Sequence, residues 1–120
     1  MTAMQALHAF WSSFNLPAYD ENTVPDKTAL PYITYEAKED FFNSTMALSA
    51  SIWYRSPSWA DVTAKEEQIA FFIGRGGRMV AFDEGAFWIK RGTPWAQRMS
   101  DASDEMIRRI VLNIEIEFLT

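Results

Sequence analysis

The residues best suited to catalysis in this 120-residue chain are few and scattered. His8 is its one histidine, and no motif supplies it with a nucleophile and an orienting acid. The sequence has no cysteine, which excludes cysteine nucleophiles, zinc–thiolate sites and disulfide frameworks. We therefore interpret His8 as a histidine on the surface of a helix.

The acidic residues that could act as acids, bases or metal ligands occur as neighbours in the sequence. The pairs stand at 20–21, 39–40, 66–67, 83–84 and 104–105. Adjacent carboxylates rarely point to one place, whereas general acid–base catalysis needs two groups whose surroundings separate their pKa values. There is no EF-hand spacing and no D-x-D cluster. We therefore interpret these carboxylates as charged groups exposed to solvent, and a magnesium or calcium site remains the alternative.

The glycine-rich stretch 74–77 (GRGG) is placed the wrong way round for a phosphate-binding loop. Such a loop follows a strand and opens a helix, whereas this stretch ends a predicted helix and leads into a predicted strand. It predicts a helix C-cap and a tight entry into a hairpin. We expect no cofactor, no resident metal and no enzymatic activity.

Charge is distributed unevenly along the chain, whose net charge is −5. Residues 1–74 hold 4 basic and 9 acidic side chains (−5), residues 75–98 hold 5 and 2 (+3), and residues 99–120 hold 2 and 5 (−3). The basic stretch also carries aromatic residues, and tryptophan and arginine are the types enriched at the centres of protein interfaces. The candidate contact residues are Tyr19, Arg75, Arg78, Trp88, Lys90, Arg91, Trp95 and Arg98.

Three interpretations of this basic, aromatic stretch are open. Contact between copies of the chain is favoured, because a basic patch on one subunit can meet an acidic patch on the next and close a ring. Basic and aromatic side chains also form platforms for single-stranded nucleic acid. The aromatic residues can instead simply fill the core.

Length and composition indicate one folded domain. A chain of 120 residues has the commonest domain size, and 48% apolar with 15% aromatic residues excludes a disordered chain. The acidic balance argues against general duplex binding, which depends on basic residues neutralising phosphates. We find no signal peptide or membrane-spanning segment and expect a soluble protein of the cytosol.

The predicted elements divide the domain into three parts. In 1–15 the apolar residues repeat every three or four positions, which predicts a helix closed by Asn15. Residues 16–31 contain three prolines and several acidic residues, typical of an extended arm. Residues 32–120 form the core.

The core 32–120 is predicted to combine strands with one further helix. Strands are expected at 32–37 and 46–54 around a turn at 40–45, and at 110–118. A helix begins near Ser58, the candidate N-cap with Asp61 completing a capping box, and ends at Gly74. A hairpin pairs 78–82 with 86–90, broken at 93–95 and followed by a polar loop over 97–105. The whole predicts an α+β domain with a mostly antiparallel sheet of four to five strands and two flanking helices.

Four stretches of the sequence resemble small structural proteins of tailed bacteriophages. They are 16–19 (LPAY), 30–35 (LPYITY), 51–56 (SIWYRS), which opens the helix, and 88–97 (WIKRGTPWAQ). Together with the order of elements, which covers nearly the whole chain, they are most similar to the tail terminator, or tail-completion, family.

The resemblance implies a virion protein without catalytic residues. It implies a six-membered ring that caps the tail tube at its head-proximal end, stops tube polymerisation and joins the tail to the neck. The implied partners are further copies of the chain, the tail-tube protein and a neck or head-completion protein, with no membrane and with DNA passing through the lumen without sequence-specific binding. An acidic chain suits such a lumen, because it does not attract phosphates. Two alternatives remain. One is another neck or tail-tube subunit. The other is a single-strand nucleic-acid-binding module that uses Trp88, Trp95, Arg75 and Arg78.

Overall fold

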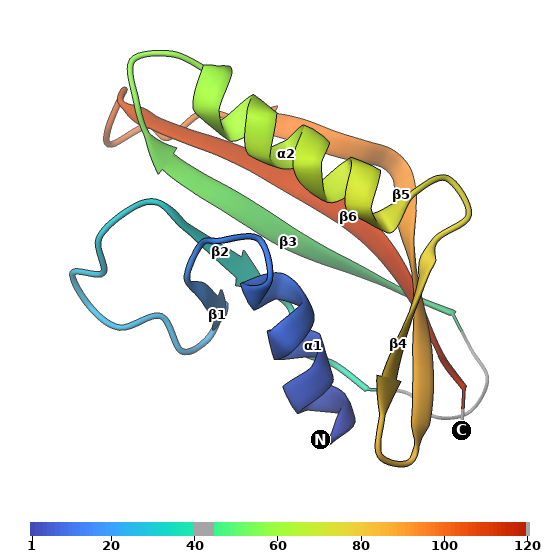
Figure 1. Ribbon diagram of the computed structural model, residues 1–120. Helices are drawn as coiled ribbons and strands as arrows, with labels where there is room; N and C mark the ends of the chain where they lie inside the picture. The colour runs from blue at the N-terminus through green and yellow to red at the C-terminus, as the bar shows by residue number, and fades with distance from the viewer. Residues whose placement is uncertain (40–44, 120) are drawn as a thin grey trace.

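The computed structural model describes residues 1–39 and 45–119. Within them lie two helices, α1 (Ala3–Ser12) and α2 (Ala60–Ile73), and one six-stranded sheet (Figure 1). The strands are β1 (Ala18–Asp20), β2 (Tyr32–Tyr35), β3 (Thr45–Arg55), β4 (Arg78–Phe82), β5 (Gly85–Met99) and β6 (Ile107–Leu119). Their order across the sheet is β1-β2-β3-β6-β5-β4, so the long strands β3 and β6 form its centre.

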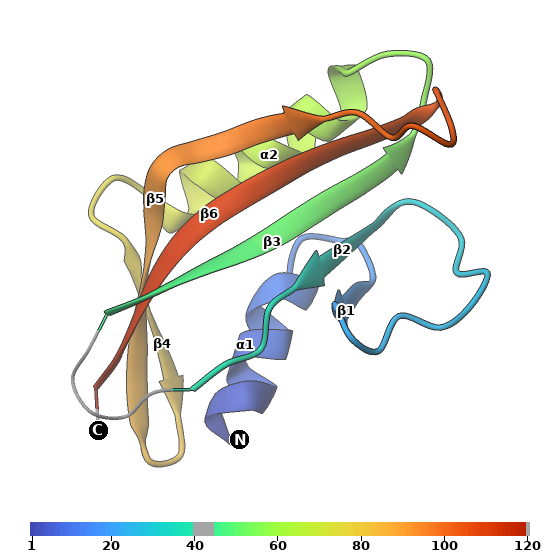
Figure 2. The same cartoon turned by 180° about the vertical axis from the view of Figure 1, so that it is seen from behind.

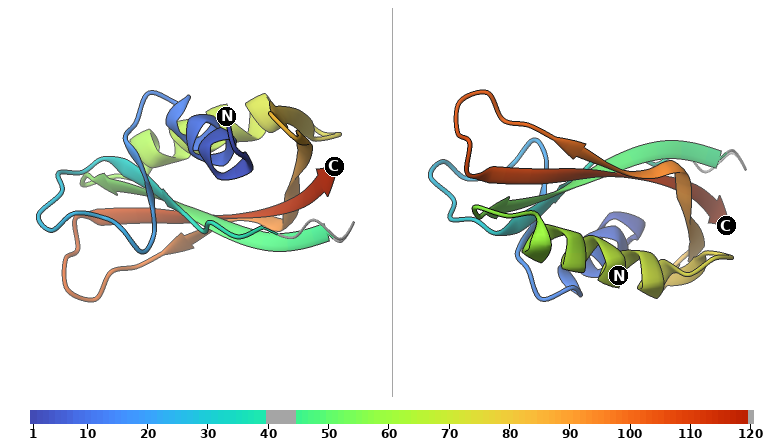
Figure 3. Two further views of the ribbon diagram at one scale, coloured as in Figure 1. Left: turned by 90° about the horizontal axis from the view of Figure 1, so that it is seen from below. Right: turned by 90° about the horizontal axis from the view of Figure 1, so that it is seen from above.

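Both helices lie on the same face of the sheet, here called the inner face (Figure 3). α2 packs across β3, β6 and β5, and from behind it is seen beyond these strands (Figure 2). α1 contacts β1 and β2 at one edge of the sheet and β4 at the other edge. The sheet therefore curls around α1, and within the described residues no helix lies on its outer face.

The predicted α+β class is confirmed, and the predicted sheet is corrected. It has six strands, and β1 pairs with β2 in parallel, through Ala18 opposite Ile33. The additional strand comes from the start of the predicted arm. The side chain of Ala18 is buried, and the amide of Ile33 donates to the carbonyl of Pro17 at 2.8 Å. The first residues of the predicted arm therefore form a strand of the sheet.

The alternation that predicted the central strands is confirmed by burial. Every second residue of β6 from Ile110 to Phe118 is buried, as are Leu48, Ala50 and Ile52 of β3 opposite them. These side chains form the floor on which α2 packs Val62, Ile69 and Ile73. A fully buried large aliphatic side chain contributes about 1.5–3 kcal/mol, so this double layer supplies much of the stability.

α1 is held by its cap and by aromatic packing. Thr2 accepts from the amide of Gln5 at 3.1 Å, and the Gln5 side chain accepts from the amide of Thr2 at 2.8 Å, which completes a capping box. The apolar face that the spacing predicts is buried, with Trp11 at 0% and Phe14 at 2% exposure. Asn15 follows at φ +62°, the left-handed conformation predicted for the end of this helix.

Of three local predictions around α2 and before β3, one is corrected, one is confirmed and one lies mostly outside the described residues. The residue before α2 is Trp59, which makes no side-chain cap, so the predicted capping box of Ser58 and Asp61 does not form. The Ser58 hydroxyl accepts only from the amide of Ala60, at 3.3 Å. The end of α2 at Gly74, with φ +78°, is as predicted. The predicted turn at 40–45 lies outside the described residues except for Thr45, the first residue of β3.

β5 does not break at 93–95 but continues to Met99 through a bulge. Arg91 pairs with Ile114 and Ala96 with Leu112, so residues 92–95 stand opposite the single residue Asn113. A Cβ on Gly92 would lie 3.0 Å from the Asn113 carbonyl oxygen, and the Asn113 amide donates to the carbonyl of Pro94 at 2.9 Å. Pro94 lies within the bulge, outside the regular pairing of β5 with β6, so it does not break the strand as predicted.

Gly77 is the position in the turn before β4 where a side chain is excluded. Its φ is +88°, and an added Cβ would lie 2.3 Å from the Trp88 indole nitrogen and 2.7 Å from the Ile89 carbonyl oxygen. We expect Gly77→Ala to lower the free energy of unfolding by about 2 kcal/mol through strain and displacement of Trp88. Urea denaturation followed by tryptophan fluorescence measures this. The control is Gly76→Ala, where no atom lies within 4 Å of an added Cβ, and equal losses in both variants would contradict the prediction.

Candidate functional site

The only histidine links α1 to the sheet. His8 Nδ1 lies 2.9 Å from the Tyr35 hydroxyl, and its Nε2 lies 3.3 Å from the Ser12 hydroxyl. Burial, and then the charge of Asp20, raise the pKa of Tyr35. Across residues 1–39 and 45–119, no three His, Asp or Glu side chains gather in a way that could hold a metal ion. In this arrangement His8 bridges two elements, in keeping with a histidine on a helix surface.

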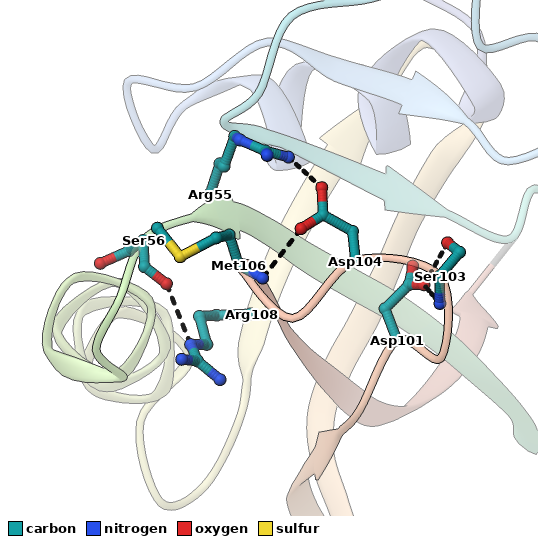
Figure 4. Close-up of polar contacts among 7 residues, drawn as sticks. All are labelled: Arg55, Ser56, Asp101, Ser103, Asp104, Met106 and Arg108. Carbon is teal, nitrogen blue, oxygen red and sulfur yellow. Dashed lines mark hydrogen bonds and ion pairs between the residues drawn. The ribbon is translucent and has the colours of Figure 1, made fainter.

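The acidic residues between β5 and β6 stabilise their own loop (Figure 4). Asp101 accepts from the Ser103 amide at 2.8 Å and from its hydroxyl at 2.6 Å, and these bonds lower the pKa of Asp101. Asp104 accepts from the Met106 amide at 2.9 Å and pairs with Arg55, contacts that lower the pKa of Asp104. Asp101 therefore stabilises the turn itself, and Asp104 both stabilises the turn and ties it to the end of β3.

The predicted contact residues of the basic stretch are divided between the two faces of the sheet. Trp88 and Lys90 of β5 stand opposite Glu117 and Glu115 of β6 on the outer face. The Trp88 indole donates to the Gly76 carbonyl at 2.9 Å, and the Lys90 ammonium lies 5.8 Å from the Trp88 ring centroid. These two residues are brought together. Arg91 and Arg75 are exposed, in β5 and in the turn before β4 respectively.

The other members of that predicted set face the helices. The Arg78 guanidinium lies 3.8 Å from the centroid of Phe72. The Trp95 indole donates to the Glu66 carboxylate of α2 at 3.2 Å, which explains the acidic residue within the apolar stripe of that helix. Arg98 lies 4.8 Å from the centroid of Trp59. Trp88 and Trp95 therefore do not form one aromatic platform.

The last predicted contact residue, Tyr19, joins an aromatic row on the outer face. Its ring lies 5.7 Å from Tyr32, and Tyr32 lies 6.3 Å from Trp53. Arg109 of β6 stacks 4.4 Å from the Trp53 centroid and donates to Ser51 at 3.1 Å. Tyr32, Trp53 and Arg109 were not identified as a group from the sequence, because they belong to three different strands.

Large apolar side chains are exposed where α2, β4 and β5 meet the turn 74–77. We call Met79 and Trp88, which lie on the outer face, the hairpin-end patch; their exposed fractions are 54% and 40%, while Phe71, on the side of α2 that faces away from the sheet, is 91% exposed. Met79 and Trp88 are cross-strand partners, and Phe71 lies three residues before Gly74. Arg75, Lys90 and Arg91 are the cations of the same stretch. This is the combination of residue types found at the centres of protein interfaces.

Among the described residues, open grooves lie on the outer face of the sheet and between α1 and β4. One, of about 360 Å³, lies on the outer face beside the β5 bulge and is lined by Glu36, Ser49, Asn113 and Glu115 among others. The second, also about 360 Å³, runs between α1 and β4 and is lined mainly by apolar residues. The lining residues of this second groove, called here the α1–β4 groove, are Met1, Ala6, Ala9, Phe10, Ser13, Phe72, Arg78, Met79, Val80 and Ala81.

Comparison of the chain with protein-family models, with curated proteins and with solved structures finds no match. Among the described residues, neither helix is long and apolar enough to cross a bilayer.

Glu36, in the outer-face groove, is the carboxylate with the clearest structural role. Burial, the largest single effect, opposes its charge. Hydrogen bonds from the Ser49 amide (2.6 Å), the Ser49 hydroxyl (2.8 Å) and Lys38 outweigh burial and lower the pKa of Glu36. The carboxylate thereby ties the end of β2 to β3.

A lowered pKa means that Glu36 stabilises the fold above the carboxyl pKa of the unfolded chain, and that this stability is lost as pH falls through the folded pKa. We expect Glu36→Gln to lower the free energy of unfolding by about 1 kcal/mol at pH 7, and the difference from the parent protein to vanish at acidic pH. Denaturation curves across a pH series measure this. Glu84→Gln, at the exposed hairpin tip, is the control, and a loss independent of pH would contradict the assignment.

Proposed function

We propose that the protein is a structural virion subunit, a bacteriophage tail terminator whose copies form a ring on the end of the tail tube. The proposal rests on the resemblance of 16–19, 30–35, 51–56 and 88–97 to that family. The observation that supports it most directly is the hairpin-end patch, in which Met79 and Trp88 are exposed beside Lys90, with Phe71 of α2 exposed separately on the other side of the sheet.

An exposed cluster of this kind is typical of a surface that is covered in an assembly. Transfer of apolar surface out of water contributes about 25 cal/mol per Å², so Phe71 at 91% and Met79 at 54% exposure gain free energy when a second protein covers them. Tryptophan and arginine are enriched among the few residues that supply most of the binding energy at protein interfaces. A subunit that acts by contact, without catalysis, is consistent with these features.

The charge of the chain is also consistent with a subunit of a ring around DNA. The net charge is −5, and Glu115 and Glu117 lie together on the outer face of β6. Acidic side chains in a lumen would repel the phosphates of passing DNA. A lumen lined mainly by basic side chains would argue against this part of the proposal.

Two alternatives differ from the terminator in what they assemble with. A tail-tube subunit would polymerise into filaments, whereas a terminator stops at one closed ring, and a neck subunit would join the tail from the head side. A single-strand nucleic-acid-binding module needs its aromatic residues on one surface. Trp88 on the outer face and Trp95 against α2 do not share one.

The decisive experiment measures the mass of the purified protein over a concentration series and images the same samples by negative stain. Closed rings of one size support the terminator. Filaments would replace it with a tube subunit, and a monomer at every concentration would contradict self-assembly. Anisotropy titration with an oligonucleotide at low salt tests the remaining alternative, which requires binding that weakens as salt rises.

The basic hairpin can be tested within the same assay. We expect Trp88→Ala combined with Arg91→Ala to raise the concentration needed for assembly at least about tenfold, because loss of an interface tryptophan and arginine typically costs 2 kcal/mol or more. Circular dichroism and the thermal midpoint check that the fold is retained. Met106→Ala, an exposed apolar residue in the loop between β5 and β6, is the control. Unchanged assembly in the double variant would remove the hairpin from the interface.

A further inference from the structure

The α1–β4 groove is an apolar surface at one edge of the sheet. Ala6, Ala9 and Phe10 of α1 form one wall, and Val80 and Ala81 of β4 form the other. β4 pairs with β5, and in the described part of the chain no strand pairs with its second side. An edge strand beside an apolar groove is a surface on which an extended segment can bind, through backbone hydrogen bonds and small apolar side chains.

The groove lining contains one side-chain cation, Arg78, and the amino group of Met1, which pairs with Asp83. Arg78 packs its guanidinium on Phe72 and donates to the Phe72 carbonyl at 2.9 Å, which fixes a cation in the groove lining. Arg75 is exposed in the adjoining turn. Segment 74–81 therefore carries two cations and no acid, a net charge of +2.

The arm between β1 and β2 has the complementary properties. Residues 21–31 hold Glu21 and Asp26 against Lys27, a net charge of 1 − 2 = −1. Pro25 and Ala29 are exposed within it, and its shape is set by local contacts such as the Thr28 hydroxyl donating to the Pro25 carbonyl. The segment extends away from the helices at the β1–β2 edge of the sheet, opposite to β4 (Figures 1 and 2).

We propose that residues 21–31 of one copy bind in the α1–β4 groove of the next copy. The inference rests on the proposed function and specifies the contact that builds the ring. Arm and groove lie at opposite edges of one sheet, so the contact is head to tail, and such a heterologous contact closes into a ring when its rotation allows. The acidic arm meets Arg75 and Arg78, while the small and apolar residues of the arm meet Ala81 and Phe72.

The absence of cysteine from the chain allows a direct test by single-cysteine cross-linking. Ala29→Cys marks the arm and Ala81→Cys marks the groove, and both alanines are exposed. Mixed in equal amounts and treated with a short bis-maleimide, the two single variants should give a covalent dimer. Its yield should be about tenfold above that from Ala29→Cys mixed with Ala102→Cys, the exposed control in the loop between β5 and β6. The yield should fall as salt rises, because the attraction is between exposed charges.

A chain that carries both Ala29→Cys and Ala81→Cys extends the test. Head-to-tail contact predicts a ladder of covalent oligomers that stops at the number of subunits in the ring. Rings that form without a ladder would overturn the arm-in-groove contact and leave the proposed function standing. Neither rings nor a ladder would overturn both. Covalent dimers of Ala29→Cys alone, at the yield expected for the mixture, would show arms meeting arms and would also overturn the inference.

Discussion

The fold depends on covering one face of a short helix. α1 has ten residues, too few for a stable helix in water, and buries Trp11 completely together with Leu7 and Phe10. No single strand is wide enough to cover those aromatic rings, so β1 and β2 meet α1 from one edge of the sheet and β4 meets it from the other. The curl of the sheet and the bulge in β5 are both consistent with that requirement.

The elements that could be predicted from sequence are those whose burial is periodic. The spacing of Leu7, Phe10 and Trp11, and the alternation along β6, each report one buried face, and the structure confirms both. β1 has only three residues, too short for a period, so the sequence indicated an arm where the sheet gains its parallel strand. Pro94 indicated a broken strand, because the sequence does not show that a bulge can leave a proline outside the ladder.

The sequence predicted which types of residue the candidate surfaces contain, but not where those residues lie on the fold. A run of basic and aromatic residues identifies a segment, but not the face on which each side chain lies. The fold itself uses several of them: Arg78 lies on Phe72, Arg98 on Trp59, and Trp95 binds Glu66. The row that joins Tyr32, Trp53 and Arg109 comes from three strands, and its cross-strand pairing cannot be read from any one stretch of the sequence.

The bulge of β5 also changes which residues of that strand face the helices. Before it, the even-numbered Trp88 and Lys90 lie on the outer face; after it, the even-numbered Arg98 packs on Trp59 near the start of α2. A one-residue insertion elsewhere in β5 would turn every following side chain to the wrong face. Residues 92–95 already stand opposite one residue, so a change of length there can be taken up locally while both flanking registers are kept. This bulge is therefore the place in the sheet where related proteins could differ in length and still share one core.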